Sequence, residues 1–182
     1  MLRLLDLIFA LIGLLLLWPL LLVLLLLGWF DTRSPLFCQV RVGRYQQPFT
    51  LIKLRTMHPD TPSVASHLLG KETITSYGRF LRRTKLDELP QLWNVLKGDM
   101  SLVGPRPGLV NQFELTAARE KQGVFSARPG ITGLAQVNAI DMSTPELLAE
   151  TDARMLQNLT LATYFKYIFM TLAGKGRGDR VK

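Results

Sequence analysis

The sequence predicts an α+β fold that is mainly helical, with short β-hairpins and a hydrophobic helix at the N-terminus. Residues 7–30 carry no charge and are mostly leucine, residues 39–55 alternate in polarity, and later apolar residues recur at helical spacing. From these observations and a length of 182 residues, we expect a membrane-inserted helix over residues 1–31 and one compact domain over residues 32–182.

The charge balance favours an anionic partner. The formal net charge is +8 and the sequence pI is near 10.0. Such a balance is typical of proteins that bind nucleic acid, anionic lipid headgroups or phosphorylated substrates. Cys38 is the only cysteine, which excludes an intramolecular disulfide and a cysteine-based metal site and fits a reducing, cytosol-facing domain.

The N-terminal apolar run is long enough to cross a bilayer. As a helix, the 24 residues from Leu7 to Phe30 extend ~36 Å, more than the ~30 Å of a hydrocarbon core. Pro19 removes one backbone donor and clashes with the carbonyl of Leu15, so we expect the helix to bend there. The run is too long for a signal peptide, and no small-residue cleavage site follows it.

Two topologies stay open for this helix on the residues alone. A spanning helix is the simplest interpretation of an apolar run of this length. Basic residues flank both ends, however, with Arg3 before the run and Arg33, Arg41 and Arg44 after it, whereas a spanning helix needs one basic flank. A helix that enters, bends at Pro19 and leaves by the same face satisfies both flanks, provided that the carbonyls freed at the bend find partners.

Residues 39–55 predict a β-hairpin. Polarity alternates before a turn at Gly43, and residues 49–55 form the second strand. Because side chains alternate along a strand, Lys53 and Arg55 share one face. These two cations are either solvated or the edge of a phosphate-binding surface.

A polar loop and an amphipathic helix follow the hairpin. We expect a loop over residues 58–73, in which His58 and His67 lack the spacing of metal ligands. Apolar residues at helical spacing then predict a helix over residues 74–83. Its polar side faces headgroups or a substrate phosphate with Arg79, Arg82 and Arg83.

Two adjacent carboxylates, Asp87 and Glu88, allow a structural and a catalytic interpretation. Thr84 and Asp87 have the spacing of a capping box, and the apolar face that follows ends at Gly98. The same helix N-terminus, however, can receive phosphate oxygens, and a carboxylate there can attack phosphorus or hold a divalent metal. Neighbours on a helix diverge by about 100°, so the two carboxylates must have different roles.

The run from Gly104 to Gly108 predicts a stiff loop that presents an arginine. Pro105 and Pro107 restrict the backbone, and Arg106 between them carries a guanidinium suited to bidentate phosphate binding. A surface turn is the alternative. A second Arg-Pro turn begins at Arg128, before the strand-like residues 134–138.

The C-terminal third predicts one long helix. Thr144 caps it, Pro145 occupies its first turn, and Gly174 ends it. The aromatic half, residues 164–170, is either core or an interfacial amphipathic helix. A basic tail follows with Lys175, Arg177, Arg180 and Lys182.

These segments together resemble the bacterial sugar transferases, and specifically the small monotopic phosphoglycosyl transferases, over nearly the whole chain. The residues that carry the resemblance are Lys53 to Met57, Arg82 to Gln91, Gly98 to Pro107 and Arg128 to Gly133. The Asp87-Glu88 and Pro105-Arg106-Pro107 motifs, in this order and spacing, are its most specific part.

The resemblance implies transfer of a sugar-1-phosphate from a UDP-sugar donor to undecaprenyl phosphate, with release of UMP. It implies that Asp87 is the nucleophile of a ping-pong cycle and that Glu88 assists through metal or proton handling. Mg²⁺ would be held in part by Asp87 and Glu88. Arg106 would clamp substrate phosphate, and the further substrate-binding positions would be Lys53, Arg55, Arg82, Arg83, Pro105, Pro107 and Arg128.

The resemblance also implies a re-entrant, proline-broken N-terminal helix that places the whole protein on the cytoplasmic face of a bacterial inner membrane. Membrane lipid is then a partner, nucleic acid is not, and a homodimer stays an open alternative. This chain departs from the pattern at two points. Trp18-Pro19 replaces a Ser-Pro break, and Ala139-Ile140 replaces a Gly-Arg pair, which affects sugar recognition or a phosphate contact.

Two other function classes compete with this interpretation. A non-catalytic membrane-surface adaptor would use the basic surface to bind anionic lipid, but it leaves the Pro-Arg-Pro loop without a role. A membrane-tethered nucleic-acid binder would interleave aromatic with basic residues, whereas the aromatic residues here cluster near the tail.

Overall fold

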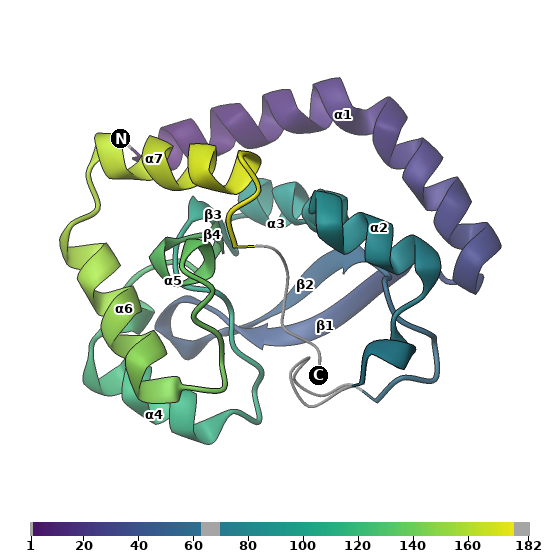
Figure 1. The fold of residues 1–182 in the computed structure, drawn as a ribbon. Coiled ribbons are helices and arrows are strands. Elements are labelled where there is room, and N and C mark those ends of the chain that lie inside the picture. Colours follow the sequence, from purple (N-terminus) through teal and green to yellow (C-terminus); the bar gives the residue numbers. More distant parts are fainter. Residues whose placement is uncertain (1, 63–69, 177–182) are drawn as a thin grey trace.

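The computed structural model describes residues 2–62 and 70–176 (Figure 1). The elements are α1 (Leu2–Thr32), β1 (Leu36–Val42), β2 (Pro48–Leu54), α2 (Ser76–Thr84), α3 (Gln91–Lys97), β3 (Ser101–Val103), α4 (Phe113–Lys121), β4 (Gly130–Thr132), α5 (Leu134–Val137), α6 (Pro145–Gln157) and α7 (Leu161–Leu172). Short 3-10 turns occupy Arg44–Gln46, Lys71–Thr73, Leu86–Glu88 and Val124–Ser126. The mainly helical α+β class predicted from the sequence is confirmed.

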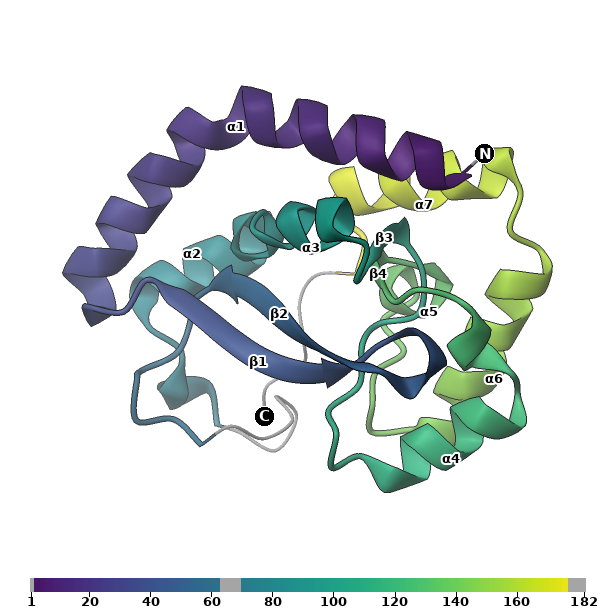
Figure 2. The ribbon, with the colours of Figure 1, turned by 180° about the vertical axis from the view of Figure 1, so that it is seen from behind.

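Helix α1 is continuous over Leu2–Thr32 and is bent near its middle, where Pro19 lies (Figures 1 and 2). It is the one helix in the described part of the chain that is long and apolar enough to cross a membrane. Its outward side chains are exposed leucines and aromatics, Trp18 and Phe30 among them. An exposed apolar surface of this extent is typical of a site that contacts a membrane or another protein.

Both halves of α1 pack against the rest of the chain. In the first half, Ala10 is fully buried, and Gly13 lets the helix approach Leu92 of α3. In the second half, Leu24 is buried in a cluster with β2 and α2. The Tyr77 hydroxyl of α2 donates a 2.7 Å hydrogen bond to the carbonyl of Leu24. The helix therefore contacts one compact domain on both sides of its bend.

The start of α1 is held by its two charged residues. Arg3 donates to the carbonyls of Val95 and Met100 at the end of α3, at 2.7 and 3.0 Å. Asp6 is 2% exposed, and its Oδ1 accepts hydrogen bonds from the Tyr164 hydroxyl (2.9 Å) and from Ser101 Oγ and the Leu102 amide (each 3.0 Å). Burial and the nearby Asp6 carboxylate raise the pKa of Tyr164.

Two of the cations that flank the apolar run are therefore protein contacts. Besides Arg3, Arg44 donates to the carbonyl of Ser126 at 2.8 Å. The topology argument counted these residues only as basic flanks of the apolar run, and the sequence alone did not indicate their internal partners.

Strands β1 and β2 form the predicted antiparallel hairpin, with Val42 opposite Pro48. The second sheet, however, is a parallel pair of β3 and β4 rather than another hairpin. The strand expected over residues 134–138 is wrong, since these residues form α5 and the strand is Gly130–Thr132. A short apolar run such as Leu134–Val137 fits either element, so periodicity could not distinguish them.

The predicted single helix from Pro145 to Gly174 is also wrong, because Asn158 to Thr160 separate α6 from α7. The Thr160 side chain accepts from the Thr163 amide in a capping box, which starts a new helix. Thr144 precedes α6 but makes no capping hydrogen bond.

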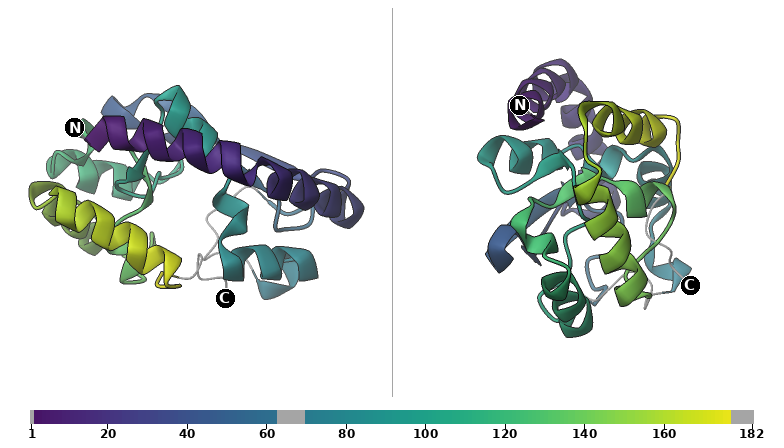
Figure 3. Two further views of the ribbon diagram at one scale, coloured as in Figure 1. Left: turned by 90° about the horizontal axis from the view of Figure 1, so that it is seen from above. Right: turned by 90° about the vertical axis from the view of Figure 1, so that its left-hand side faces the viewer.

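Helix α7 lies beside the first half of α1 (Figure 3), where Phe165 contacts the ring of Phe9 edge to face. Tyr164 and Tyr167 are buried, whereas Phe169 and Leu172 are exposed. The aromatic half of the C-terminal segment therefore supplies both core and an apolar outer surface. Of the predicted loop and basic tail, His67, Arg177, Arg180 and Lys182 lie outside the described residues.

Candidate active site

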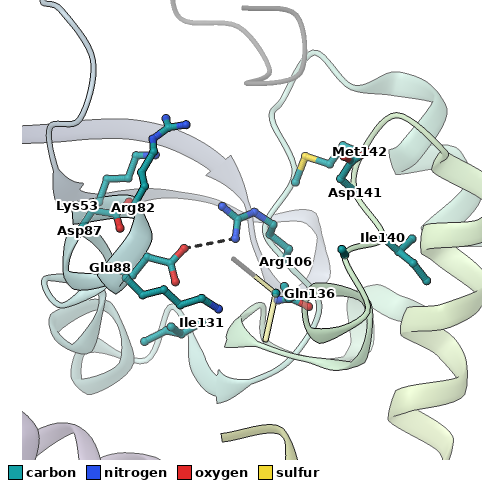
Figure 4. A pocket seen from close by; sticks show the side chains of 13 residues that line it. Lys53, Arg82, Asp87, Glu88, Arg106, Ile131, Gln136, Ile140, Asp141 and Met142 are labelled. Carbon is teal, nitrogen blue, oxygen red and sulfur yellow. Dashed lines mark hydrogen bonds and ion pairs between the residues drawn. The ribbon is translucent and has the colours of Figure 1, made fainter. Parts of the chain in front are cut away.

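A pocket opens between the end of β2, α2, the 86–88 turn, the loop after β3, and α5 with the segment that follows it (Figure 4). The space between its walls is about 810 Å³, a value that includes the open solvent at its mouth. Its lining consists of Lys53, Arg82, Lys85, Asp87, Glu88, Arg106, Ile131, Gln136, Ala139, Ile140, Asp141, Met142 and Gly176.

The backbone around Asp87 and Glu88 differs from the predicted helix N-terminus. Lys85 has a left-handed conformation (φ 58°) that ends α2, and a 3-10 turn over Leu86–Glu88 follows it. Helix α3 starts only at Gln91. The capping box expected from Thr84 is wrong, because its hydroxyl donates backward to carbonyls of α2. The helix stop at Gly98 is confirmed.

The two carboxylates have different surroundings. Glu88 Oε1 lies 3.4 Å from Nη1 of Arg106. Asp87 is 7% exposed and lines the pocket, and its carboxylate accepts no hydrogen bond from residues 2–62 or 70–176. One carboxylate is thus held by a cation while its neighbour stays available to a ligand.

Four cations converge on these carboxylates from three parts of the chain. Lys53 comes from β2, Arg82 and Lys85 from α2 and its C-terminus, and Arg106 from the loop after β3. Figure 4 shows Lys53 and Arg82 on the side of Asp87, with Arg106 across from them. Against them stand three lining carboxylates, so the lining is formally positive by one charge (four minus three) and suits an anionic ligand.

Neighbouring groups hold two of these cations. Arg82 Nε donates to Thr56 Oγ1 at 2.9 Å. Lys85 Nζ donates to the carbonyl of Lys175 at 3.0 Å, which joins the C-terminal segment to the pocket. Burial lowers the pKa of Lys85, and the Glu88 carboxylate opposes that shift.

Two further predicted cations lie outside the pocket lining. Arg55 donates to Ser34 at the base of the hairpin and lies over the Phe37 ring, as does Lys53. Arg83 is exposed on α2. The shared strand face of Lys53 and Arg55 is confirmed, but of the two only Lys53 reaches the pocket.

Of the remaining predicted residues, Pro105 and Pro107 hold the loop that carries Arg106, and Arg128 contacts the end of α3. The carbonyl of Pro105 accepts from the Gly130 amide at 2.8 Å, and that of Pro107 accepts from Arg41 at 3.1 Å. Arg128 donates to the carbonyl of Gly98 at 2.8 Å. Burial lowers the pKa of Arg128, and nearby Arg3 and Arg44 lower it further.

Sequence reasoning missed the wall formed by α5, residues 139–142 and Gly176. Gln136 donates to the carbonyl of Gly104 at 3.3 Å, which fixes α5 against the loop that carries Arg106. Ala139 has a left-handed φ of 55°. In the sequence, only the Ala139-Ile140 pair, which departs from the family pattern, pointed to this wall. The wall reaches the pocket through long-range contacts, which the local sequence does not reveal.

Two of the pocket's carboxylates, Asp87 and Glu88, are the kind of ligand that a magnesium ion takes. No group of three or more potential metal ligands occurs in the described part of the chain. Mg²⁺ does not need one, because it is often bound by one or two carboxylates together with substrate phosphates and water. Asp87 and Glu88 are the carboxylates that would hold it.

Comparison with known proteins gives consistent matches. The sequence profile of the family described as "Bacterial sugar transferase" matches residues 1–176. A UDP-glucose:undecaprenyl-phosphate glucose-1-phosphate transferase of Caulobacter vibrioides is 42% identical over 164 residues, covering 85% of this chain and 61% of the relative. A putative undecaprenyl-phosphate N-acetylgalactosaminyl 1-phosphate transferase of Bacillus subtilis is 46% identical over 108 residues, or 58% and 60% of the two chains.

A more distant relative adds a third sugar. A UDP-galactose-lipid carrier transferase of Erwinia amylovora is 34% identical over 184 residues, which cover 92% of this chain and 38% of the relative. The chain thus spans less than two thirds of the length of each of these three relatives. Their names agree on lipid-linked sugar transfer and differ in the sugar.

Proposed function

The chain belongs to the bacterial sugar transferase family, and from this premise we propose that it transfers a sugar-1-phosphate from a UDP-sugar to undecaprenyl phosphate. UMP is the second product, and the reaction would be the first membrane step in assembling a glycoconjugate. The observation that carries the proposal is the pocket. In it, the Asp87 carboxylate accepts no hydrogen bond from the described residues, and four cations line the same pocket.

Asp87 is the proposed nucleophile. Its carboxylate oxygen attacks the β-phosphorus of the UDP-sugar, the bond from this phosphorus to the bridging oxygen breaks, and UMP leaves with that oxygen. The phosphosugar stays on Asp87 as an acyl phosphate. A phosphate oxygen of undecaprenyl phosphate then attacks the same phosphorus and releases the Asp87 carboxylate. A covalent intermediate lets one site take two anionic substrates in turn.

The other lining residues orient and neutralise the phosphates. Arg106 presents a fork suited to two phosphate oxygens, and Glu88 fixes the orientation of that fork through their ion pair. Lys53, Arg82 and Lys85 supply further positive charge. When bound at Asp87 and Glu88, Mg²⁺ would neutralise phosphate charge in the transition state.

We further propose that α1 is re-entrant and that the catalytic domain lies on the cytoplasmic face of the bacterial inner membrane. Contacts of both helix halves with one domain, through Asp6 before the bend and Leu24 after it, support this topology. A straight spanning helix would carry one of these ends away from the domain. The exposed Phe169 and Leu172 of α7 add an apolar surface beside α1.

The test follows UMP release from a panel of UDP-sugars with undecaprenyl phosphate and Mg²⁺. We expect metal-dependent release by the wild type and by Asp60→Asn, an exposed carboxylate outside the pocket, and none by Asp87→Asn. Intact-protein mass spectrometry without the lipid acceptor should show a phosphosugar adduct on the wild type. Equal release by Asp87→Asn would remove this residue from the mechanism, and vesicle binding without any UMP release would favour the adaptor.

A further inference from the structure

A buried ion pair outside the pocket joins two neighbouring helices. Arg119 of α4 is 3% exposed and Asp152 of α6 is fully buried. Nη2 and Nε of Arg119 donate to Oδ2 of Asp152 at 2.6 and 3.1 Å. The two helices lie side by side at the end of the molecule away from α1 (Figure 1).

The same guanidinium makes a third contact that leads to the pocket. Nη1 of Arg119 donates to the backbone carbonyl of Arg106 at 2.8 Å. The side chain of Arg106 leaves this backbone in the direction of the pocket and meets Glu88. A continuous series of polar contacts therefore runs from Asp152 through Arg119 and Arg106 to Glu88.

A contribution to the stability of the fold does not by itself explain why a buried ion pair is present at Arg119 and Asp152. Removing two charges from water is costly, and apolar residues of similar volume often replace buried ion pairs with no loss of stability. Asp152 Oδ1 also has no hydrogen-bond partner within the described residues. What an apolar pair could not reproduce is the hydrogen bond to the Arg106 carbonyl.

We propose that Arg119 and Asp152 are positioning residues for Arg106. Asp152 fixes the plane of the Arg119 guanidinium, and Arg119 fixes the backbone on which Arg106 is mounted. Backbone contacts at Pro105 and Pro107 hold the loop on either side, so the Arg119 bond sets the position between them. That this position matters for phosphate binding rests on the proposed function.

The decisive variant replaces the pair by apolar residues of similar size, Arg119→Met with Asp152→Leu. We expect a Tm equal to or above that of the wild type, because no uncompensated charge stays buried. UMP release should nevertheless fall by ~10-fold or more, since small misplacements of a positioning group are costly. Unchanged kcat/KM in this folded variant would overturn the proposal.

Substitution of Arg106 gives the matched control. If the pair acts through Arg106, the apolar replacement should add little in an Arg106→Ala background, because the interaction it supports is already absent. UDP-sugar affinity, measured on Asp87→Asn protein so that no turnover occurs, provides the comparison. Equal losses with and without Arg106 would show that the pair acts elsewhere, and would overturn the proposal.

Amide hydrogen exchange separates this inference from the proposed function. Without any substrate, residues 104–109 should exchange faster in the apolar-pair variant than in the wild type, because the loop loses one of its fixed points. That result would support the positioning of the loop even if no UDP-sugar were turned over. Identical exchange in this segment would contradict it, whatever the activity.

Discussion

Arg106 and Glu88 meet across the pocket, with Nη1 and Oε1 3.4 Å apart, although 18 residues separate them in sequence. The contact gives Glu88 a partner that its neighbour Asp87 does not have within the described residues. This asymmetry is the physical basis for assigning different roles to two carboxylates that are adjacent in sequence. In the proposed mechanism, phosphate and Glu88 share this guanidinium.

Substituting Arg106 by Lys should therefore be harmful although the charge is kept. A lysine ammonium lacks the planar fork that can meet Glu88 and a phosphate together. We expect kcat/KM for the UDP-sugar to fall by ~10-fold or more, about 1.4 kcal/mol of transition-state stabilisation. Steady-state kinetics of UMP release measure it. As a control, Arg83→Lys on the exposed face of α2 should behave as wild type, and equal effects of both changes would exclude a fork-specific role.

Replacing Ala139 by Gly should stabilise the fold. Ala139 has a left-handed φ of 55°, a conformation that costs a non-glycine residue about 1 kcal/mol. We expect the free energy of unfolding to rise by up to ~1 kcal/mol. Ala118→Gly inside α4 should have the opposite sign. Chemical denaturation in detergent compares the two, and destabilisation by both changes would contradict the strain argument.

Gly176 should be sensitive to a single added carbon. A Cβ there would lie 2.1 Å from the carbonyl oxygen of Gln136, and φ is +65°. Gly176→Ala should displace the C-terminal segment, weaken the contact between Lys85 and Lys175, and lower UMP release. Gly123 has a similar φ of +68° but open space around it, so Gly123→Ala controls for backbone strain. The prediction fails if both variants keep full activity.

The hydrogen bond from Tyr77 to Leu24 predicts a pH-dependent contribution to stability. Burial and then Asp31 raise the pKa of Tyr77 to about 12, from 10.0. Between these values the unfolded chain releases the proton and the folded chain keeps it, so stability falls as pH rises. We expect Tyr77→Phe to cost about 1 kcal/mol near neutral pH. Its deficit relative to wild type should shrink from pH 10 to pH 12, and a constant difference would contradict this.

Local signals in the sequence were sufficient for several elements. The apolar run with its proline gave a bent helix, alternation gave the β1–β2 hairpin, and Gly98 ended α3 as expected. Each of these depends on neighbours along the chain. The Asp87-Glu88 and Pro-Arg-Pro motifs likewise lie at one pocket, with Asp87, Glu88 and Arg106 in its lining.

Errors arose where tertiary contacts decide between similar local patterns. Thr84, Thr144 and Thr160 all precede helical sequence, but only Thr160 forms a capping box in the structure. Arg55 and Arg128, which were expected to bind substrate, donate hydrogen bonds to backbone carbonyls that the sequence did not indicate. The partner of a cation depends on which backbone carbonyls the tertiary structure leaves without a hydrogen bond nearby. Local sequence patterns do not predict this.

Under the proposed function, the attachment of α1 at both of its halves determines how the protein meets its lipid acceptor. Arg3 and Asp6 hold one half, and the hydroxyl of Tyr77 holds the other. A helix held in this way has a fixed position relative to the domain and does not act as a flexible tether. In the proposed topology and mechanism, the protein's own contacts set the height of Asp87 above the lipid, so the lipid acceptor must raise its phosphate to that level to react.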